Sequence, residues 1–188
     1  MIGGMMNRFV TFSLFFLHIS FAHGFESQCM KIKSFNKFEI IEIGAQKEFT
    51  FCLPNKFAKH ELVEILQTKA RMQMQLSETN LSKSDIEELS TTGKVTINVD
   101  SNKLSKFELV DLAIARAKLT VSTSTTSLNK VELSDLARTG NLDLIIDSKK
   151  FNKFELVEII QAGANVSFVS DEFFNKNDMS ELLGFQKK

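Results

Sequence analysis

The segment LSKFELVDL, residues 104–112, recurs in recognisable form along the whole of this 188-residue chain. Each copy has an apolar residue, a helix-cap residue, a lysine, an acid two residues later, an apolar residue, a second acid, and a final Leu or Ile. The copies begin at Phe35, Phe57, Leu81, Leu104, Leu128, Phe151 and Phe174, with 22 to 24 residues between successive starts. Self-similarity at a nearly fixed period of this length indicates a repeat protein.

Each copy carries the signals of a helix N-terminus. Six copies place Ser or Asn at the second position, where the side chain accepts a hydrogen bond from the first helical turn. An acid three residues later completes a capping box. The cap residues are Asn36, Ala58, Ser82, Ser105, Asn129, Asn152 and Asn175, and only Ala58 is a poor cap. We therefore expect a helix of roughly two to three turns in every repeat.

Glycines follow these helical segments. Gly44, Gly93, Gly140, Gly163 and Gly184 are all the glycines beyond residue 24. Each is expected to end its helix in a left-handed C-cap.

Alternating apolar and polar residues precede the middle helices. Met72, Met74 and Leu76 alternate with Gln73 and Gln75, and similar runs occupy residues 95–99, 119–122, 142–146 and 166–168. This period of two means that one face of each strand is buried and the other faces water. Because strand and helix alternate, successive strands must run parallel. The predicted fold class is α/β, an open solenoid of about seven strand-loop-short-helix repeats with a parallel sheet on one face.

The repeat resembles a leucine-rich repeat. Residues 97–104 have the LxLxxNxL spacing of that family, and residues 74–81 show it with Thr79 at the Asn position. Thr126 and Lys149 also replace this Asn, and Lys94 stands at the first apolar position of the family pattern. The alternative is another βα-repeat family of similar geometry. The resemblance covers residues 71–183 and implies a curved solenoid whose exposed strand face binds a protein.

Residues 1–24 are typical of a secretory signal peptide. Arg8 supplies a positive start, an apolar run of 13 residues follows, and Ala22 and Gly24 are small residues at a cleavage site before Phe25. The run is shorter than the roughly 20 residues that a membrane-spanning helix needs, which favours cleavage over an uncleaved anchor. We expect residues 25–188 to form one secreted, periplasmic or extracellular domain that does not span a membrane, with an N-terminal cap at about 25–70.

The two cysteines, Cys29 and Cys52, fall in the first two expected strands, on the solvent-facing side. In an exported chain such a pair favours a disulfide over two free thiols. The bridge would stabilise the fold by roughly 3 kcal/mol, at the end of a solenoid, where a repeat lacks one neighbour. Two cysteines supply too few ligands for a metal site.

No catalytic arrangement stands out. His60 is the only histidine beyond residue 24, at a variable helix position, whereas nucleophilic catalysis needs a base beside its nucleophile. The carboxylates recur in every repeat, which favours a structural role over catalytic pairing. We expect a protein that is not an enzyme and uses no cofactor or metal. The balance of 23 basic and 23 acidic residues argues against a nucleic-acid partner.

A lysine begins every expected helix, where the helix dipole disfavours a cation. The set is Lys37, Lys59, Lys83, Lys106, Lys130, Lys153 and Lys176. We favour pairing with carboxylates of the neighbouring repeat. The alternative is a lysine column that binds an anionic glycan or another acidic polymer.

The exposed strand side is the predicted partner-binding face. One row is expected to contain Gln73, Thr96, Thr120, Asp143 and Ser167, and the next Gln75, Asn98, Ser122 and Ile145. The surface is polar and nearly uncharged, with Ile145 as its single apolar side chain, and residues 122–127 are expected to widen it and loosen the fifth repeat. It lacks the Trp, Tyr and Arg typical of hot spots, which indicates a weak, extended or multivalent contact, or a face that is merely solvated.

The expected function is therefore non-catalytic binding of a protein partner outside the cytoplasm, through the polar strand face. The first alternative is a structural subunit that forms homo-oligomers through the C-terminal edge strand, residues 165–170, because an unpaired edge invites pairing with another chain. The second alternative is the anionic-glycan binder described above.

Overall fold

The computed structural model describes residues 29–186, so the expected signal peptide lies outside the described residues. Seven helices and six strands alternate within this range. They are α1 (Lys37–Gln46), β1 (Phe49–Cys52), α2 (Lys59–Leu66), β2 (Ala70–Gln75), α3 (Lys83–Ser90), β3 (Val95–Asn98), α4 (Lys106–Ile114), β4 (Lys118–Ser122), α5 (Lys130–Ala137), β5 (Leu142–Ile146), α6 (Lys153–Ala162), β6 (Asn165–Phe168) and α7 (Lys176–Gly184).

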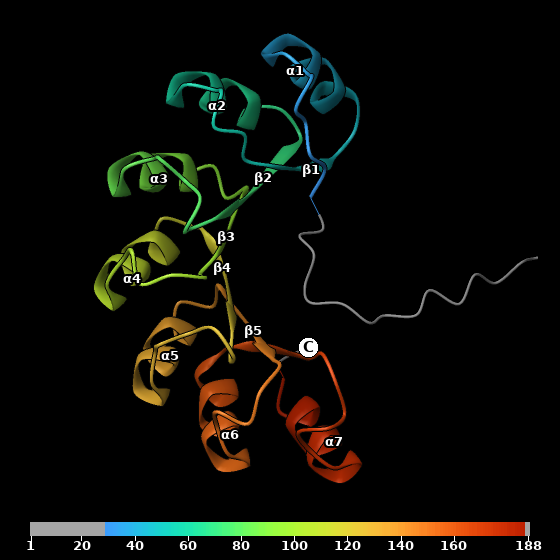
Figure 1. The fold of residues 1–188 in the computed structure, drawn as a ribbon, viewed down its shortest axis with the longest axis vertical. Helices are drawn as coiled ribbons and strands as arrows, with labels where there is room; N and C mark the ends of the chain where they lie inside the picture. The colour runs from blue at the N-terminus through green and yellow to red at the C-terminus, as the bar shows by residue number, and fades with distance from the viewer. Residues whose placement is uncertain (1–28, 187–188) are drawn as a thin grey trace, which may run out of the picture.

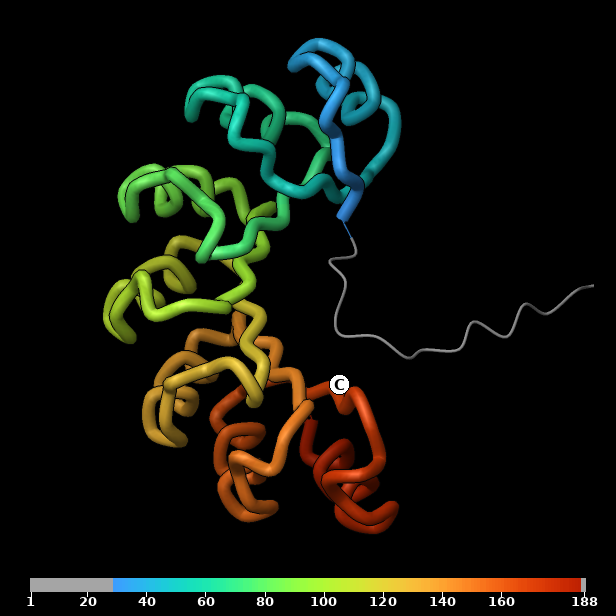
Figure 2. The backbone as a smooth tube through the Cα atoms, in the orientation of Figure 1, coloured from blue at the N-terminus to red at the C-terminus, as the bar shows by residue number. Residues whose placement is uncertain are grey.

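The strands form one open parallel sheet in the order β1-β2-β3-β4-β5-β6, so each strand pairs with its neighbours in the chain. The chain coils into an arc, with the strands on the inner side and all helices on the outer side (Figures 1 and 2). This arrangement confirms the predicted α/β solenoid. Apolar residues of the strands and helices form one continuous core between these two layers. No helix in the described range is long and apolar enough to cross a membrane.

The helix starts follow the predicted capping pattern. All seven helices begin at the repeated lysine, one residue after the cap. In α4, for example, the Ser105 hydroxyl accepts from the Glu108 amide, and the Glu108 carboxylate accepts from the Ser105 amide at 2.8 Å. Ala58 has no side-chain acceptor, so in α2 only the return bond from the Ala58 amide to Glu61 is made, at 3.0 Å. Local sequence alone therefore places every helix start.

The helix ends depart from the prediction at two glycines. Gly93, Gly140 and Gly163 have the expected positive φ. Gly44 instead lies inside α1, where a Cβ would come within 2.2 Å of Thr68 Oγ1, and Gly184 is the last residue of α7. The reason for glycine at position 44 is therefore close packing rather than backbone conformation. In the turn between α4 and β4 the left-handed residue is Arg116, with a φ of 76°.

The predicted disulfide is present. Cys52 ends β1, and Cys29 lies beside it just before Met30, which forms an isolated parallel bridge with Phe51. The Met30 amide donates to the Thr50 carbonyl at 2.9 Å, and the Cys52 amide donates to the Met30 carbonyl at 3.0 Å. The disulfide thus holds a rudimentary strand at Met30 along the outer edge of β1.

Candidate functional site

The inner side of the arc carries the polar side chains of the strands, and the strand pairing divides them into rows. Gln73 pairs with Thr96, and Thr96 pairs with Lys118. A second row runs through Gln75, Asn98, Thr120, Asp143 and Asn165. Both rows cross several repeats without interruption. They form two lines of hydrogen-bonding groups along the inner surface.

The predicted rows are confirmed between β2 and β3 and between β4 and β5, but their register was wrong between β3 and β4 and between β5 and β6. Thr120 was expected beside Thr96 but pairs with Asn98, and Ser122 pairs with Ile145 but not with Asn98. The partners are shifted by two residues, which leaves every side chain on its predicted face. Ser167 likewise pairs with Ile145 rather than Asp143. Period-two alternation determines which face of the sheet a side chain lies on, whereas the length of each helix-to-strand turn determines which residue of the next strand it pairs with.

The inner face is also less exposed than predicted. Gln73, Asn98 and Ile145 retain only 8%, 9% and 4% of their accessible surface, while the other predicted site residues, Gln75, Thr96, Thr120, Ser122 and Asp143, are half-buried. Neighbouring strands lie only ~4.8 Å apart, so each side chain is flanked from both sides. Ile145 is therefore not an exposed apolar contact. The Gln73 amide nitrogen lies 3.4 Å from Asn98 Oδ1, so these two side chains partly satisfy each other.

A hollow of about 190 Å³ opens at the N-terminal half of this face. The structure brings Gln73, Gln75 and Asn98 together in its wall, beside the Cys29–Cys52 bridge. Sites for drug-sized ligands usually measure ~300–1,000 Å³. The hollow therefore has room for a protein side chain rather than for a large organic ligand.

The loop after β4 is fastened to the next repeat. The Asp147 carboxylate accepts from the hydroxyls of Ser122 (2.6 Å), Thr123 (2.9 Å) and Ser124 (2.7 Å), and from the Ser124 amide (2.8 Å). Partial burial acts to raise the pKa of Asp147, but the hydrogen bonds from Ser122, Ser124 and Thr123 outweigh it and lower the pKa below its ordinary value. This bonding is the opposite of the predicted loosening of the fifth repeat.

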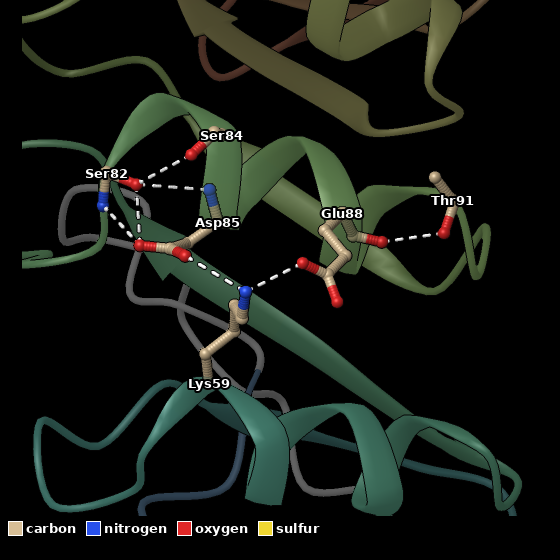
Figure 3. A network of polar contacts seen from close by, with 6 residues as sticks. All are labelled: Lys59, Ser82, Ser84, Asp85, Glu88 and Thr91. Atoms are coloured by element: carbon tan, nitrogen blue, oxygen red, sulfur yellow. Dashed lines mark hydrogen bonds and ion pairs between the residues drawn. The ribbon is translucent and has the colours of Figure 1, made fainter.

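In each of the helices α1 to α6, the lysine that begins the helix pairs with an acid on the following helix, as predicted. We call these pairs the lysine ladder; they are Lys37–Glu64, Lys59–Glu88, Lys83–Asp111, Lys106–Asp135, Lys130–Glu158 and Lys153–Glu181. Figure 3 shows one rung, where Lys59 of α2 points between Asp85 (3.5 Å) and Glu88 (2.8 Å) of α3. The acids offset the unfavourable position of a cation at a helix start.

The electrostatics of the ladder agree with this pairing. Hydrogen bonding to Glu88 raises the pKa of Lys59, and hydrogen bonding to Glu158 does the same for Lys130. Hydrogen bonds from Ser82 lower the pKa of Asp85, the capping-box acid that also faces Lys59. The ladder lysines are half-buried, but most of the acids are exposed, so water screens each rung and a rung contributes little to stability on its own.

The ladder is incomplete at its two ends. Lys176 of α7 has no following helix, and Glu42 of α1 occupies the acid position without a preceding lysine; within residues 29–186 neither side chain forms an ion pair. The other six lysines that begin helices are each paired with an acid. The anionic-glycan alternative therefore loses most of the free positive charge on which it depended.

Two features of the surface were missed in the sequence. Phe38, Phe107 and Phe154, at the second position of their helices, are 73%, 72% and 79% exposed, with Lys106 Nζ 4.7 Å from the Phe107 ring centre. The second feature is Arg116, which replaces the glycine used in the equivalent turns of other repeats. Alignment of the repeats against Gly93 and Gly140 would have revealed it.

His60 is exposed on α2, and no group of three potential metal ligands occurs among the residues that the structure describes. The arrangement offers hydrogen-bond donors and acceptors in rows. Neither protein-family models nor curated proteins yield a match to this chain, so the leucine-rich repeat stands as a resemblance of pattern.

Proposed function

We propose that this protein is an exported, non-catalytic module that binds a protein partner through the inner strand face. The observation that carries the proposal is the polar row Gln75-Asn98-Thr120-Asp143-Asn165, which crosses five adjacent strands. A solenoid builds such an extended surface from contacts between neighbouring repeats alone. Export is supported by the Cys29–Cys52 bridge, since disulfides persist in oxidising compartments, and by the signal-peptide pattern.

The chemistry of this face favours a protein over a small molecule. The hollow beside Gln73 and Gln75 is small, whereas a row of amides, hydroxyls and a carboxylate can bond to an extended chain or a polar protein surface at many points. Stable protein interfaces cover about 800 Å² on each partner, so such a contact would extend along the row and beyond the hollow. The half-burial of these side chains pre-orders them, which reduces the entropy lost on binding.

Affinity capture from extracellular fluid of the source organism tests this proposal. The bait is residues 25–188, compared with a Gln75→Lys/Thr120→Lys variant that adds two long cations to the half-buried inner row. His60→Lys adds one charge on the outer side and serves as the matched control. A protein retained by the native bait and His60→Lys, but lost by the double variant, supports the proposal. Equal retention by all three baits, with unchanged circular dichroism, contradicts it.

A second candidate function is assembly into head-to-tail chains of copies. The observation that favours it is the pair of unused ladder ends, Lys176 and Glu42. A second copy that continued the solenoid would bring its α1 beside α7, and Glu42 would then receive Lys176 as the next rung. The outer edge of β6 would meet the rudimentary strand at Met30. On that edge the Val166 carbonyl accepts from the Gln186 side chain at 2.8 Å, which a second copy would have to displace.

Charge exchange at the two ends tests the assembly. Lys176→Glu and Glu42→Lys are each expected to abolish concentration-dependent growth in sedimentation velocity, because each opposes like charges across the junction. An equimolar mixture of the two variants is expected to restore growth, because the exchanged ends are again complementary. A native protein that remains monomeric up to the highest accessible concentration refutes the assembly and leaves the partner-binding proposal untouched.

A further inference from the structure

A basic hollow lies where the strands begin, and Asp143 and Asn165 of the inner polar row form part of its wall. It measures about 180 Å³, and its wall contains four cationic side chains and one carboxylate. The cations are Arg71, Lys94, Arg116 and Lys118, and the carboxylate is Asp143. This excess of positive charge contrasts with the lysine ladder, where each lysine from Lys37 to Lys153 has an acid.

Three of the four cations already have partners. Arg71 pairs with Glu48, and Lys118 pairs with Asp143 at 2.6 Å. Lys94 Nζ donates to the carbonyls of Leu66 (2.8 Å) and Thr68 at the end of α2. Carbonyl oxygens carry no net charge, so these contacts do not offset the positive charge of the Lys94 amine. The hollow is therefore positive even after its internal ion pairs are counted.

Arg116 is the fourth cation, and its guanidinium group forms no hydrogen bond or ion pair within residues 29–186, while its backbone amide donates to the Ala113 carbonyl at 3.0 Å. It is exposed, and its Cδ lies 3.9 Å from the position that a Cβ on Gly93 would take. Glycine at position 93 leaves the space beside the Arg116 side chain open. The guanidinium group is thus available to a ligand in the hollow.

The backbone at Arg116 makes this availability significant. Its φ of 76° lies in the left-handed region, which residues with a Cβ rarely adopt. The turns that follow α3 and α5 place Gly93 and Gly140 in the same conformation. This repeat therefore keeps an arginine where its neighbours use the unstrained residue. Strain of this kind persists where a side chain serves a function.

We propose that this hollow binds an oxyanion of the sulfate or phosphate class, with Arg116 as the principal ligand. A planar guanidinium can offer two parallel N–H donors to two oxygens of such a group. Lys94, which has carbonyl partners but no acid, adds long-range attraction. The Asn165 amide donates to Asp143 Oδ1 at 3.2 Å and the Asn141 amide to the Ala113 carbonyl at 2.9 Å, so the amides orient the wall while the cations hold the anion.

The experiment is a titration of residues 25–188 with inorganic sulfate and inorganic phosphate at constant ionic strength, against chloride. Binding is read from the NMR signal of the Arg116 Nε–H group and from isothermal calorimetry. Native protein is expected to bind at least one of the two anions. Arg116→Gly is expected to weaken that binding about tenfold or more. Arg138→Gln, which replaces an exposed arginine just after α5, is expected to leave it unchanged. Titration with a sulfated monosaccharide and with O-phosphoserine then distinguishes the two sources of the oxyanion.

The same variant separates binding from folding. Arg116→Gly removes the strain at φ 76° and is expected to raise the melting temperature in chloride, so a loss of anion binding would not reflect unfolding. Arg116→Lys keeps the cation and should retain part of the affinity. Two results would overturn the proposal. The first is that neither anion produces a response beyond that of chloride, and the second is that the native protein and Arg116→Gly bind the anion with equal affinity.

Discussion

Replacement of Asp147 tests how strongly one repeat is fastened to the next. Its carboxylate receives four hydrogen bonds, from Ser122, Thr123 and Ser124, at 2.6 to 2.9 Å. The Thr123 side chain is buried, with 1% of its surface exposed, so a lost partner there would not be replaced by water. Hydrogen bonds to a charged group contribute ~1.5–3 kcal/mol each in a favourable setting. Because the Ser124 donors are exposed, we expect Asp147→Ala to lower the free energy of unfolding by about 2–3 kcal/mol in all.

The contribution of the Asp147 negative charge to stability is tested by the Asp147→Asn substitution and by a change of pH. The folded-state pKa of Asp147 lies below its ordinary value, so its contribution is fully present above the unfolded pKa of about 3.9. It is lost as the pH falls through the folded pKa. Urea unfolding from pH 7 to pH 3 should show a constant difference between the native protein and Asp147→Asn above about pH 5, which shrinks below about pH 4. A difference that does not change with pH, or equal stability at pH 7, would refute this account.

Two further changes probe packing and the terminal staple. Gly44→Ala places a Cβ 2.2 Å from Thr68 Oγ1 and should lower the free energy of unfolding, measured by chemical denaturation, by about 1–3 kcal/mol. Gly184→Ala, with no atom within 4 Å of its Cβ, should raise the free energy of unfolding slightly. If both variants changed this free energy in the same direction, the packing argument would be contradicted. Cys29→Ser/Cys52→Ser should cost about 3 kcal/mol and speed hydrogen exchange first near β1; uniform acceleration through β3 and β4 would argue against a local staple.

Local signals made much of this fold predictable. A cap, a lysine and an acid at fixed spacing are sufficient to place each helix start, because the bonds that they form lie within one turn. The alternation in residues 72–76 likewise specified which face of β2 is buried. The pairing of the ladder lysines followed from charge alone, since a cation at a helix start needs a nearby acid. These predictions depend on neighbours in sequence or in the adjacent repeat.

The remaining features depend on the exact length of each turn. The turn at Arg116 sets Thr96 opposite Lys118, and no propensity distinguishes that pairing from one shifted by two residues. The burial of Gln73 and Ile145 arises from side chains on both flanking strands, which only the register defines. The sequence of residues 122–127 suggested a loose polar segment, because Asp147, the acceptor for Ser122 to Ser124, comes from the next repeat.

The contacts between repeats make the two ends of the solenoid unequal. Ladder lysines reach forward to the next helix, whereas Lys103 and Lys150 reach back to the carbonyls of Thr79 and Thr126. A terminal repeat therefore loses one set of contacts, and the N-terminal end regains stability through the disulfide. At the other end α7 has only one fully buried side chain, Leu182, compared with three in α4. In a chain of nearest-neighbour contacts, such a repeat is the first to open, unless the α1 of a second copy covers it.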